Sequence, residues 1–241
     1  MKSRHMVPEL MDDPAIDPVE HRRALCGLRR VNAICQTGKH IANEIQKIAN
    51  DRLLDSISVL DLGCGSGDIA TNVGHRLADK IYCKIHGWDI SPTAIAFAKE
   101  FDSKSKEQRL SKGRSSLDIQ YQQTDVFAET SQKFDVVYCC LFLHHFPDDQ
   151  AIKLASRMKE LATKSVLIDD LNRTTLGLIL ATIGCHLLSR SPVVHFDGPQ
   201  SVRAAFRDSE ARNVAEKAGM NLVTIKKHWP ERFLLRWDSS T

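Results

Sequence analysis

Runs of apolar and β-branched residues alternate with segments of helical periodicity through the middle of the chain. The pattern predicts strands at residues 57–62, 80–88, 117–123, 134–140 and 165–169. Helices are predicted between them at residues 68–78, 92–101 and 148–161. The second of these helices begins well, with Ser91 as N-cap and Pro92 at the first helical position. Strict alternation of strands and helices implies a parallel sheet with helices on both faces.

The two ends of the chain depart from this alternation. Between residues 17 and 51, apolar residues at helical spacing predict two helices that are split near Gly38. Residues 220–228 and 232–237 flank a tight turn, Trp229-Pro230-Glu231, and predict a hairpin that adds one antiparallel strand. The Lys- and Ser-rich residues 103–116 are predicted to form a solvated loop.

Together these elements predict one domain over residues 1–241, of the α/β class, with a doubly wound, seven-stranded, mostly parallel sheet. Residues 56–170 would form its core. A helical N-terminal cover is expected at residues 1–55 and a lid insertion at residues 171–208. A helix and the hairpin would complete the domain at residues 209–241.

Composition narrows the kinds of partner. The net charge of +3 comes from 33 basic and 30 acidic residues scattered along the chain, which argues against a nucleic-acid partner. Seven cysteines without a CxxC pair indicate neither a disulfide framework nor a zinc motif, so a cytoplasmic location is expected. The longest apolar run, residues 176–188, is too short to span a bilayer and contains His186, and no signal peptide is evident. Stable membrane insertion is therefore not expected.

The clearest chemical signal follows the first predicted strand. The sequence Asp61-Leu62-Gly63-Cys64-Gly65-Ser66-Gly67 ends an apolar strand in an acid, passes through three alternating glycines and opens a helix. Glycine suits a backbone with positive φ or one that approaches a ligand closely. The GxGxG spacing differs from the GxGxxG dinucleotide fingerprint. The turn therefore fits a ligand without a pyrophosphate, and Asp61 fits an ammonium group on that ligand.

Two further acids end the next two predicted strands. Asp89 closes the second strand, where a carboxylate can accept hydrogen bonds from ribose hydroxyls. Asp125 closes the third strand, where an acceptor can bind an adenine amino group. With the glycine turn, these acids resemble the pattern of class I S-adenosylmethionine-dependent methyltransferases, a resemblance that covers residues 56–169.

That resemblance implies a Rossmann-like methyltransferase fold, S-adenosylmethionine as cofactor and a set of cofactor contacts. Asp61, Gly63, Cys64 and Gly65 would lie beneath the methionine part. Asp89 would hold the ribose, and Ile90 would pack on the adenine ring. The remaining implied contacts are the adenine edge at Asp125 and Val126 and the backbone of Cys139 facing the methionine part. The interval from Asp89 to Asp125 is longer than the family pattern, which the Lys/Ser-rich stretch accounts for.

The fourth strand leads into a possible catalytic segment. Tyr138-Cys139-Cys140-Leu141 lacks the Asn/Asp-Pro-Pro-aromatic run of amino-methylating nucleic-acid enzymes. Leu141-Phe142-Leu143-His144-His145-Phe146 instead resembles the small-molecule branch that includes quinone-biosynthesis and polyketide-tailoring methyltransferases. Histidine suits removal of a proton from a hydroxyl or enol. His145 is therefore the first candidate for a catalytic base and His144 the second, unless both simply cap the helix that follows.

The expected substrate is a small, lipophilic aromatic, quinone-like or polyketide-like molecule, methylated on a hydroxyl or activated carbon. The apolar run 176–188 and the N-terminal helices could cover it, with His195 and Arg203 on a loop nearby. Asp169, Asp170 and Asn172 suggest Mg²⁺-dependent catechol methylation, but Cys139 and Cys140 stand where a third oxygen ligand is needed. No metal is therefore expected.

Two other classes stay open at this point. A non-catalytic S-adenosylmethionine-binding protein, regulatory or a subunit partner, would share the same glycines and acids. A nicotinamide-dependent oxidoreductase would use a related sheet, although the glycine spacing disfavours it. The sequence does not specify an oligomeric state.

Overall fold

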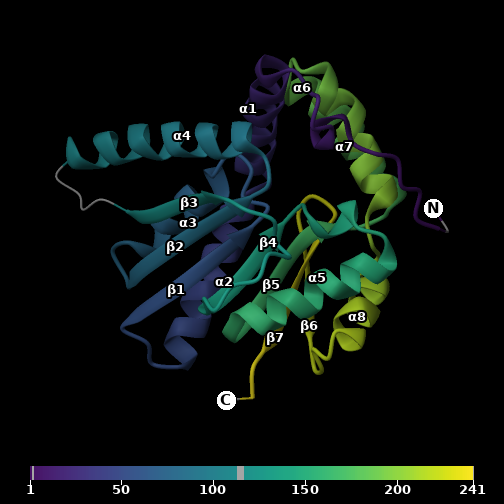
Figure 1. The fold of residues 1–241 in the computed structure, drawn as a ribbon. Coiled ribbons are helices and arrows are strands. Elements are labelled where there is room, and N and C mark those ends of the chain that lie inside the picture. The colour runs from purple at the N-terminus through teal and green to yellow at the C-terminus, as the bar shows by residue number, and fades with distance from the viewer. Residues whose placement is uncertain (2, 113–116, 241) are drawn as a thin grey trace.

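The computed structural model describes residues 1, 3–112 and 117–240 of the chain. In this part the strands form one seven-stranded sheet in the order β3-β2-β1-β4-β5-β7-β6 (Figure 1). Neighbouring strands from β3 to β5 are parallel, and β7 runs antiparallel to both β5 and β6. The predicted α/β doubly wound, mostly parallel fold is confirmed. The strands are β1 (Ser56–Leu62), β2 (Tyr82–Asp89), β3 (Asp118–Gln123), β4 (Phe134–Cys140), β5 (Ala162–Leu171), β6 (Thr224–His228) and β7 (Arg232–Asp238).

Helices cover both faces of this sheet. The α-helices are α1 (Pro18–Cys35), α2 (Thr37–Asp51), α3 (Asp68–Leu77), α4 (Pro92–Leu110), α5 (Asp148–Leu161), α6 (Thr175–Leu188), α7 (Pro192–Ala204) and α8 (Asp208–Lys217). Apolar side chains of α2, α3 and α4 share one buried cluster with one face of the sheet. Side chains of α5 and α8 pack on the opposite face. The alternating pattern of the sequence thus buries the central strands β1, β4 and β5 between two helical layers.

Helix α4 is longer than the sequence pattern predicts. It continues to Leu110, so the expectation of a loop from residue 103 is wrong for residues 103–110, while residues 113–116 lie outside the described part. Glycine and proline are absent between residues 93 and 112. The ion pairs Glu100–Lys104 and Asp102–Lys106 join residues four apart along the helix. A polar stretch without glycine or proline can therefore form an exposed helix, and polarity alone does not indicate a loop.

A third group of helices stands beyond the carboxyl edge of the sheet. Helices α1, α6 and α7 lie together there, joined by residues 4–12 of the N-terminal segment (Figure 1). Helix α2 packs against the sheet instead, through Ile41, Ile45 and Ile48, so the covering layer is narrower than residues 1–55. His195 and Arg203 lie within α7, and their expected position on a loop is wrong. The helix contains Pro199, a residue that usually interrupts helices.

The end of the chain forms the predicted hairpin. Strand β7 pairs with β5, which places its buried residues Phe233 and Leu235 in the core. Among the described residues, strand β6 pairs only with β7, so it is the outermost strand on the side of the sheet opposite β3. A bilayer-spanning helix would need a longer apolar run than any helix in the described part of the chain provides.

Candidate cofactor and active site

The glycine turn closes directly onto the end of β2. Gly63, Gly65 and Gly67 have φ of 68°, 51° and 69°, a backbone region that residues with a side chain rarely adopt. The backbone N–H groups of Gly63 and Cys64 both donate to the carbonyl of Trp88, at 2.9 and 3.0 Å. A Cβ on Gly63 would lie 2.7 Å from the ring of Phe142, so no side chain fits there. The turn is therefore held tightly beside the ends of β2 and β4.

Asp89 organises this edge of the sheet. Its Oδ2 accepts a hydrogen bond from Gly65 N at 2.9 Å, and its Oδ1 accepts one from Ser91 N at 2.8 Å. Burial raises the pKa of Asp89, although the two backbone donors oppose the shift. Ile90, next to it, leaves 69% of its surface exposed. A half-buried carboxylate beside an uncovered apolar side chain fits a ribose and an adenine face.

Asp61 ends β1 in a buried position. Only 1% of its surface is exposed, and its Oδ2 accepts a hydrogen bond from the Tyr138 hydroxyl at 2.9 Å. Burial raises the pKa of Asp61 well above its usual value, since the Tyr138 hydrogen bond offsets only part of the cost. A cationic ligand group nearby would favour the ionised form. Asp61 thus fits the ammonium group of a methionine moiety.

The other implied cofactor residues lie along the same edge. The Thr124 N–H donates to the carbonyl of Asp89 at 2.9 Å, which brings the end of β3 beside β2. Asp125 is exposed there, and its carboxylate accepts a hydrogen bond from Phe127 N, while Val126 is buried. Cys139 is fully buried in the core at the end of β4. The strand order therefore aligns Asp125, Asp89, Asp61 and Cys139 in one row, at the reversal of strand order where such sheets bind ligands.

Helix α1 closes over this row at the glycine turn. Leu25 is the nearest side chain to Gly65, 3.8 Å from where a Cβ would stand. His21, also on α1, is 5% exposed, and burial lowers its pKa although the charges of Asp89 and Asp12 oppose this. The sequence predicts an N-terminal helical cover, but not that Leu25 of α1 lies against Gly65.

Both histidines follow a sharp turn after β4. Leu141 adopts a φ of 52°, and its N–H donates to the carbonyl of Asp169 at 2.9 Å. A left-handed conformation is costly for leucine and is found where the surrounding structure imposes it. Residues 143–145 then form a short 3-10 helix, η2 (Leu143–His145). Neither histidine caps α5, whose N-cap is Pro147.

His144 is buried and held by carboxylates on both sides. Its Nδ1 lies 2.7 Å from Asp170 Oδ1, and its Nε2 lies 3.4 Å from Glu9 Oε1. Burial opposes protonation, but Asp170 and Glu9 outweigh it and raise the pKa of His144 to about 10. Its backbone N–H also donates to Asp170, at 3.1 Å. His144 is therefore fixed in orientation.

His145 is the more accessible of the pair. Its side chain keeps 19% of its surface exposed, its Nδ1 lies 2.6 Å from Asp12 Oδ2, and its Nε2 lies 3.9 Å from Glu9 Oε2. Its ring stacks on that of His144 with centroids 4.4 Å apart. Burial and the neighbouring His144 oppose protonation, but Glu9 and Asp12 raise the pKa of His145.

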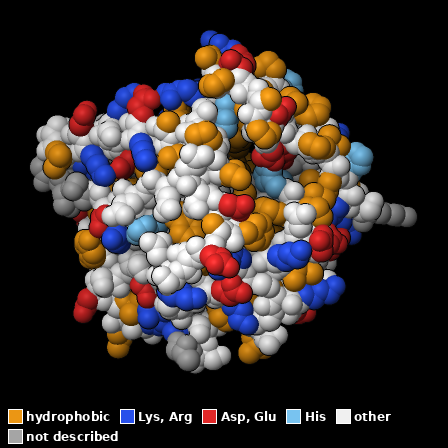
Figure 2. Space-filling model, viewed as in Figure 1, with side chains coloured by type: hydrophobic (Ala, Val, Ile, Leu, Met, Phe, Trp, Pro, Cys, Tyr) orange, Lys and Arg blue, Asp and Glu red, His pale blue; other side chains and the backbone are white. Residues whose placement is uncertain are grey.

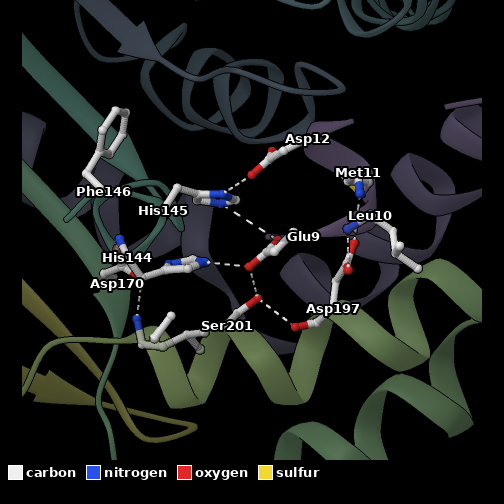
Figure 3. A network of polar contacts seen from close by, with 12 residues as sticks. Glu9, Leu10, Met11, Asp12, His144, His145, Phe146, Asp170, Asp197 and Ser201 are labelled. Atoms are coloured by element: carbon white, nitrogen blue, oxygen red, sulfur yellow. Dashed lines mark hydrogen bonds and ion pairs between the residues drawn. The ribbon is translucent and has the colours of Figure 1, made fainter. Parts of the chain in front are cut away.

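The carboxylates around the histidines come mainly from the N-terminal segment (Figure 3). The Glu9 carboxylate faces Nε2 of both rings, and its pKa falls to about 2 because the charges of His145 and His144 outweigh the effect of burial. Ser201 on α7 donates to Glu9 Oε1 at 2.6 Å, and Asp197 accepts the N–H groups of Leu10 and Met11. Sequence reasoning missed Glu9 and Asp12, since no local pattern relates them to the histidines.

Asp169 and Asp170 do not share a ligand position. Asp170 binds His144, whereas Asp169 Oδ2 lies 2.7 Å from Nε2 of His228 on β6. Successive residues of a strand point to opposite faces, so the two carboxylates diverge. The arrangement differs from the shared oxygen site that Mg²⁺-dependent catechol methylation would require.

The fold and this row of residues lie as the resemblance to class I S-adenosylmethionine-dependent methyltransferases predicts. Residues 60–165 match the family described as a methyltransferase domain. The match leaves the nicotinamide-dependent alternative without support.

Individual relatives agree with this class. The chain is 28% identical over 171 residues to the ubiquinone biosynthesis O-methyltransferase of Azoarcus sp. (strain BH72), covering 69% of this chain and 65% of the relative. It is 27% identical over 173 residues to the chloroplastic magnesium protoporphyrin IX methyltransferase of Arabidopsis thaliana, covering 72% and 48%. The chain thus spans less than two thirds of the length of either curated relative.

A solved structure shares the fold over nearly the whole chain. The magnesium protoporphyrin IX methyltransferase of Synechocystis PCC 6803, with bound S-adenosylhomocysteine, superposes with a TM-score of 0.56 at 20% identity. The match covers 95% of this chain and 90% of that structure. The covering helices are therefore included in the likeness, not only the sheet.

Proposed function

We propose that this protein transfers the methyl group of S-adenosylmethionine to an oxygen or activated carbon of a small, lipophilic molecule with aromatic, quinone-like or polyketide-like character. In this reaction the bond from the methyl carbon to sulfur breaks, its electron pair stays on sulfur, and a bond forms to the nucleophile. A hydroxyl or enol nucleophile must also lose its proton. The enzyme therefore has to align three atoms and favour the deprotonated nucleophile.

The observation that carries the proposal is the position of the histidine–carboxylate cluster of Glu9, His144 and His145 (Figure 3). The turn at Leu141 brings η2 across the sheet edge directly after β4, beside the glycine turn that closes on Phe142. A nucleophile near η2 would lie close to the methyl group of a cofactor bound along that edge. His145, the more exposed histidine, is our candidate for the base or for the group that positions the nucleophilic oxygen.

The surroundings support an apolar substrate. Phe146 contacts both Phe142 and Phe127 edge to face, with centroids 5.0 and 6.1 Å apart. In the space-filling view, hydrophobic side chains gather around a hollow that has a histidine and acidic side chains at its wall (Figure 2). The names of the two curated relatives refer to ubiquinone biosynthesis and to magnesium protoporphyrin IX. Ubiquinone and the porphyrin both contain ring systems. A lipophilic ring compound is consistent with all three.

Incubation with labelled S-adenosylmethionine and a fractionated lipid extract tests the proposed activity, with methylated products identified by mass spectrometry. We expect a labelled small molecule in at least one apolar fraction. Calorimetric titration of the cofactor on the same preparation separates the alternatives. Cofactor binding without any labelled product would favour the non-catalytic, S-adenosylmethionine-binding alternative.

The role of His145 is tested by His145→Ala. Loss of a general base typically lowers a rate by about 10²–10⁴-fold. We therefore expect kcat to fall by at least about 10²-fold, while cofactor affinity stays nearly constant. His186→Ala is the matched control, because His186 is exposed on α6 and its Nδ1 contacts the carbonyl of Thr182 on its own helix. Full turnover in His145→Ala together with loss of turnover in His144→Ala would transfer the role to His144.

A further inference from the structure

We propose that Nε2 of His144, Nε2 of His145 and the carboxylate of Glu9 form a binding site for a single Zn²⁺ ion. These side chains each offer a ligand atom, and the three atoms lie within 4.8 Å of one another. Nε2 of His144 lies 3.4 Å from Glu9 Oε1, and Nε2 of His145 lies 3.9 Å from Glu9 Oε2. Ligands about 2.0–2.1 Å from a tetrahedral zinc ion stand about 3.3 Å apart, so only small shifts would close the site.

The second nitrogen of each imidazole is held as metal sites require. Nδ1 of His144 lies 2.7 Å from Asp170, and Nδ1 of His145 lies 2.6 Å from Asp12. A carboxylate on Nδ1 keeps a proton on that nitrogen, so Zn²⁺ would displace the proton on Nε2 and bind there. Both Nε2 atoms face the same carboxylate, that of Glu9, while each Nδ1 is held by a different one. This is the arrangement that two histidine ligands and one carboxylate ligand of a single ion require.

The kind of ligand selects the ion. Two imidazole nitrogens and one carboxylate oxygen are typical of catalytic zinc sites, which keep a fourth position open. Mg²⁺ and Ca²⁺ prefer oxygen ligands throughout, so they fit these donors poorly. The open position would accept an oxygen, either from water or from the substrate.

This site deepens the proposed function and rests on it only for its catalytic consequence. A hydroxyl bound to Zn²⁺ loses its proton to solvent more readily, and the resulting oxygen is the nucleophile that accepts the methyl group. His145 would then position the nucleophile through the ion. The sequence alone predicts no metal, because Asp169 and Asp170 lack a third oxygen ligand and no local pattern relates Glu9 to the histidines.

The test is a calorimetric titration of Zn²⁺ into the full chain after chelator treatment, with retained zinc measured by mass spectrometry. We expect one equivalent to bind. Glu9→Gln and His145→Ala should weaken binding at least tenfold, and Asp12→Asn should weaken it roughly 10–100-fold by releasing the His145 ring. Asp13→Asn is the matched control, because the Asp13 carboxylate accepts a hydrogen bond from Ala15 N and is exposed. Asp12 is more than half exposed, so its variant should fold normally.

A Co²⁺ titration provides a second measurement, since tetrahedral coordination with nitrogen ligands produces strong visible absorption that Glu9→Gln and His145→Ala should abolish. Absence of bound zinc would overturn the proposal, and so would equal binding in the wild type and both variants. Methylation by protein shown to be free of metal would overturn the catalytic role of the ion while leaving the proposed function intact. Stoichiometric zinc in a protein without methylation activity would support the site and contradict the proposed function.

Discussion

Asp89 connects three parts of the cofactor edge at the scale of one residue. Its carboxylate binds the glycine turn through Gly65 and the start of α4 through Ser91, and its own carbonyl accepts the N–H of Thr124. The same carboxylate is the one that the family pattern assigns to the ribose. Asp89 therefore shapes the site, and because it is also the predicted ribose contact, its removal should weaken cofactor binding.

We expect Asp89→Ala to weaken S-adenosylmethionine binding by about 1.5–3 kcal/mol, the usual contribution of hydrogen bonds to a charged group. Isothermal titration calorimetry measures the change. Asp118→Ala is the control, because Asp118 begins β3 at the opposite end of the strands and binds the exposed Tyr82 hydroxyl. Unchanged cofactor affinity in Asp89→Ala, or tight NAD binding by the wild type, would contradict the assignment of this site.

Single residues of the site differ in how far the sequence could predict them. Asp61, Asp89 and Asp125 could be predicted, because strand ends in a parallel sheet meet at one edge and the chain order gives their positions. Glu9 and Asp12 could not, since Asp12 and His145 are 133 positions apart and meet only through the path of the N-terminal segment. Local periodicity contains no information about that path.

At the scale of elements, the buried strands and the helices between them could be predicted well. Strand β4 and helix α5 have the predicted bounds, because a continuous apolar run and a helical stripe are both unambiguous there. Helix α7 was missed, as Pro199 and Gly198 are typical of loops, and tertiary packing of Val194 and Val202 outweighs them. Helix α2 was predicted, but its packing against the face of the sheet, outside the covering layer, was not.

The position of α2 depends on an ion-pair network with the terminal hairpin. Glu44 on α2 is 8% exposed and contacts Lys226 on β6 and Arg236 on β7. Burial alone would raise the pKa of Glu44, but the hydrogen bonds and charges of these two bases lower it below 4.5. A lowered pKa means that the interaction stabilises the fold above pH 4.5, the unfolded value, and is lost as the pH falls through the folded value.

We therefore expect Glu44→Gln to lower the free energy of unfolding by about 1–2 kcal/mol at pH 7. The difference from the wild type should shrink as the pH falls below 4.5. Urea denaturation followed by circular dichroism between pH 3.5 and 7 measures both effects. Asp51→Asn is the control, since Asp51 is more than half exposed and 3.8 Å from the same Arg236, and it should change stability by less than about 0.5 kcal/mol. A constant difference at every pH would contradict the assigned electrostatic origin.

At the scale of the whole molecule, the sheet and its covering layer differ in how they are packed. Two large clusters join the sheet to its facial helices. The covering helices α1, α6 and α7 depend on two much smaller clusters, around Ala24 and Leu25. Along α6, large apolar side chains remain 49–78% exposed on one side: Leu176, Ile179, Ile183 and Leu187. A layer with so little buried apolar surface of its own should open more readily than the sheet.

The N-terminal segment holds that layer to the active site mainly through polar contacts. Arg4 donates to the carbonyls of His144, Phe146 and Ala204, and Glu9 accepts from Ser201 on α7. These contacts bury little apolar surface, so we expect the segment to release while the sheet stays folded. Release would expose the histidines and the cofactor edge together, since α1 lies over Gly65 and Asp12 binds His145.

Hydrogen exchange measured by mass spectrometry should show this directly. In the free protein, amides of residues 4–12, α1, α6 and α7 should exchange faster than those of α2, which packs in the larger cluster and is the internal reference. S-adenosylhomocysteine should slow exchange in α1, because α1 covers the cofactor edge and a ligand that binds the covered state shifts the population toward it. A lipophilic product-like compound added with it should extend the protection to α6 and α7. Uniformly slow exchange in the free protein would instead mean that the helices form a static layer, and substrate would then have to enter without any opening of α1, α6 and α7.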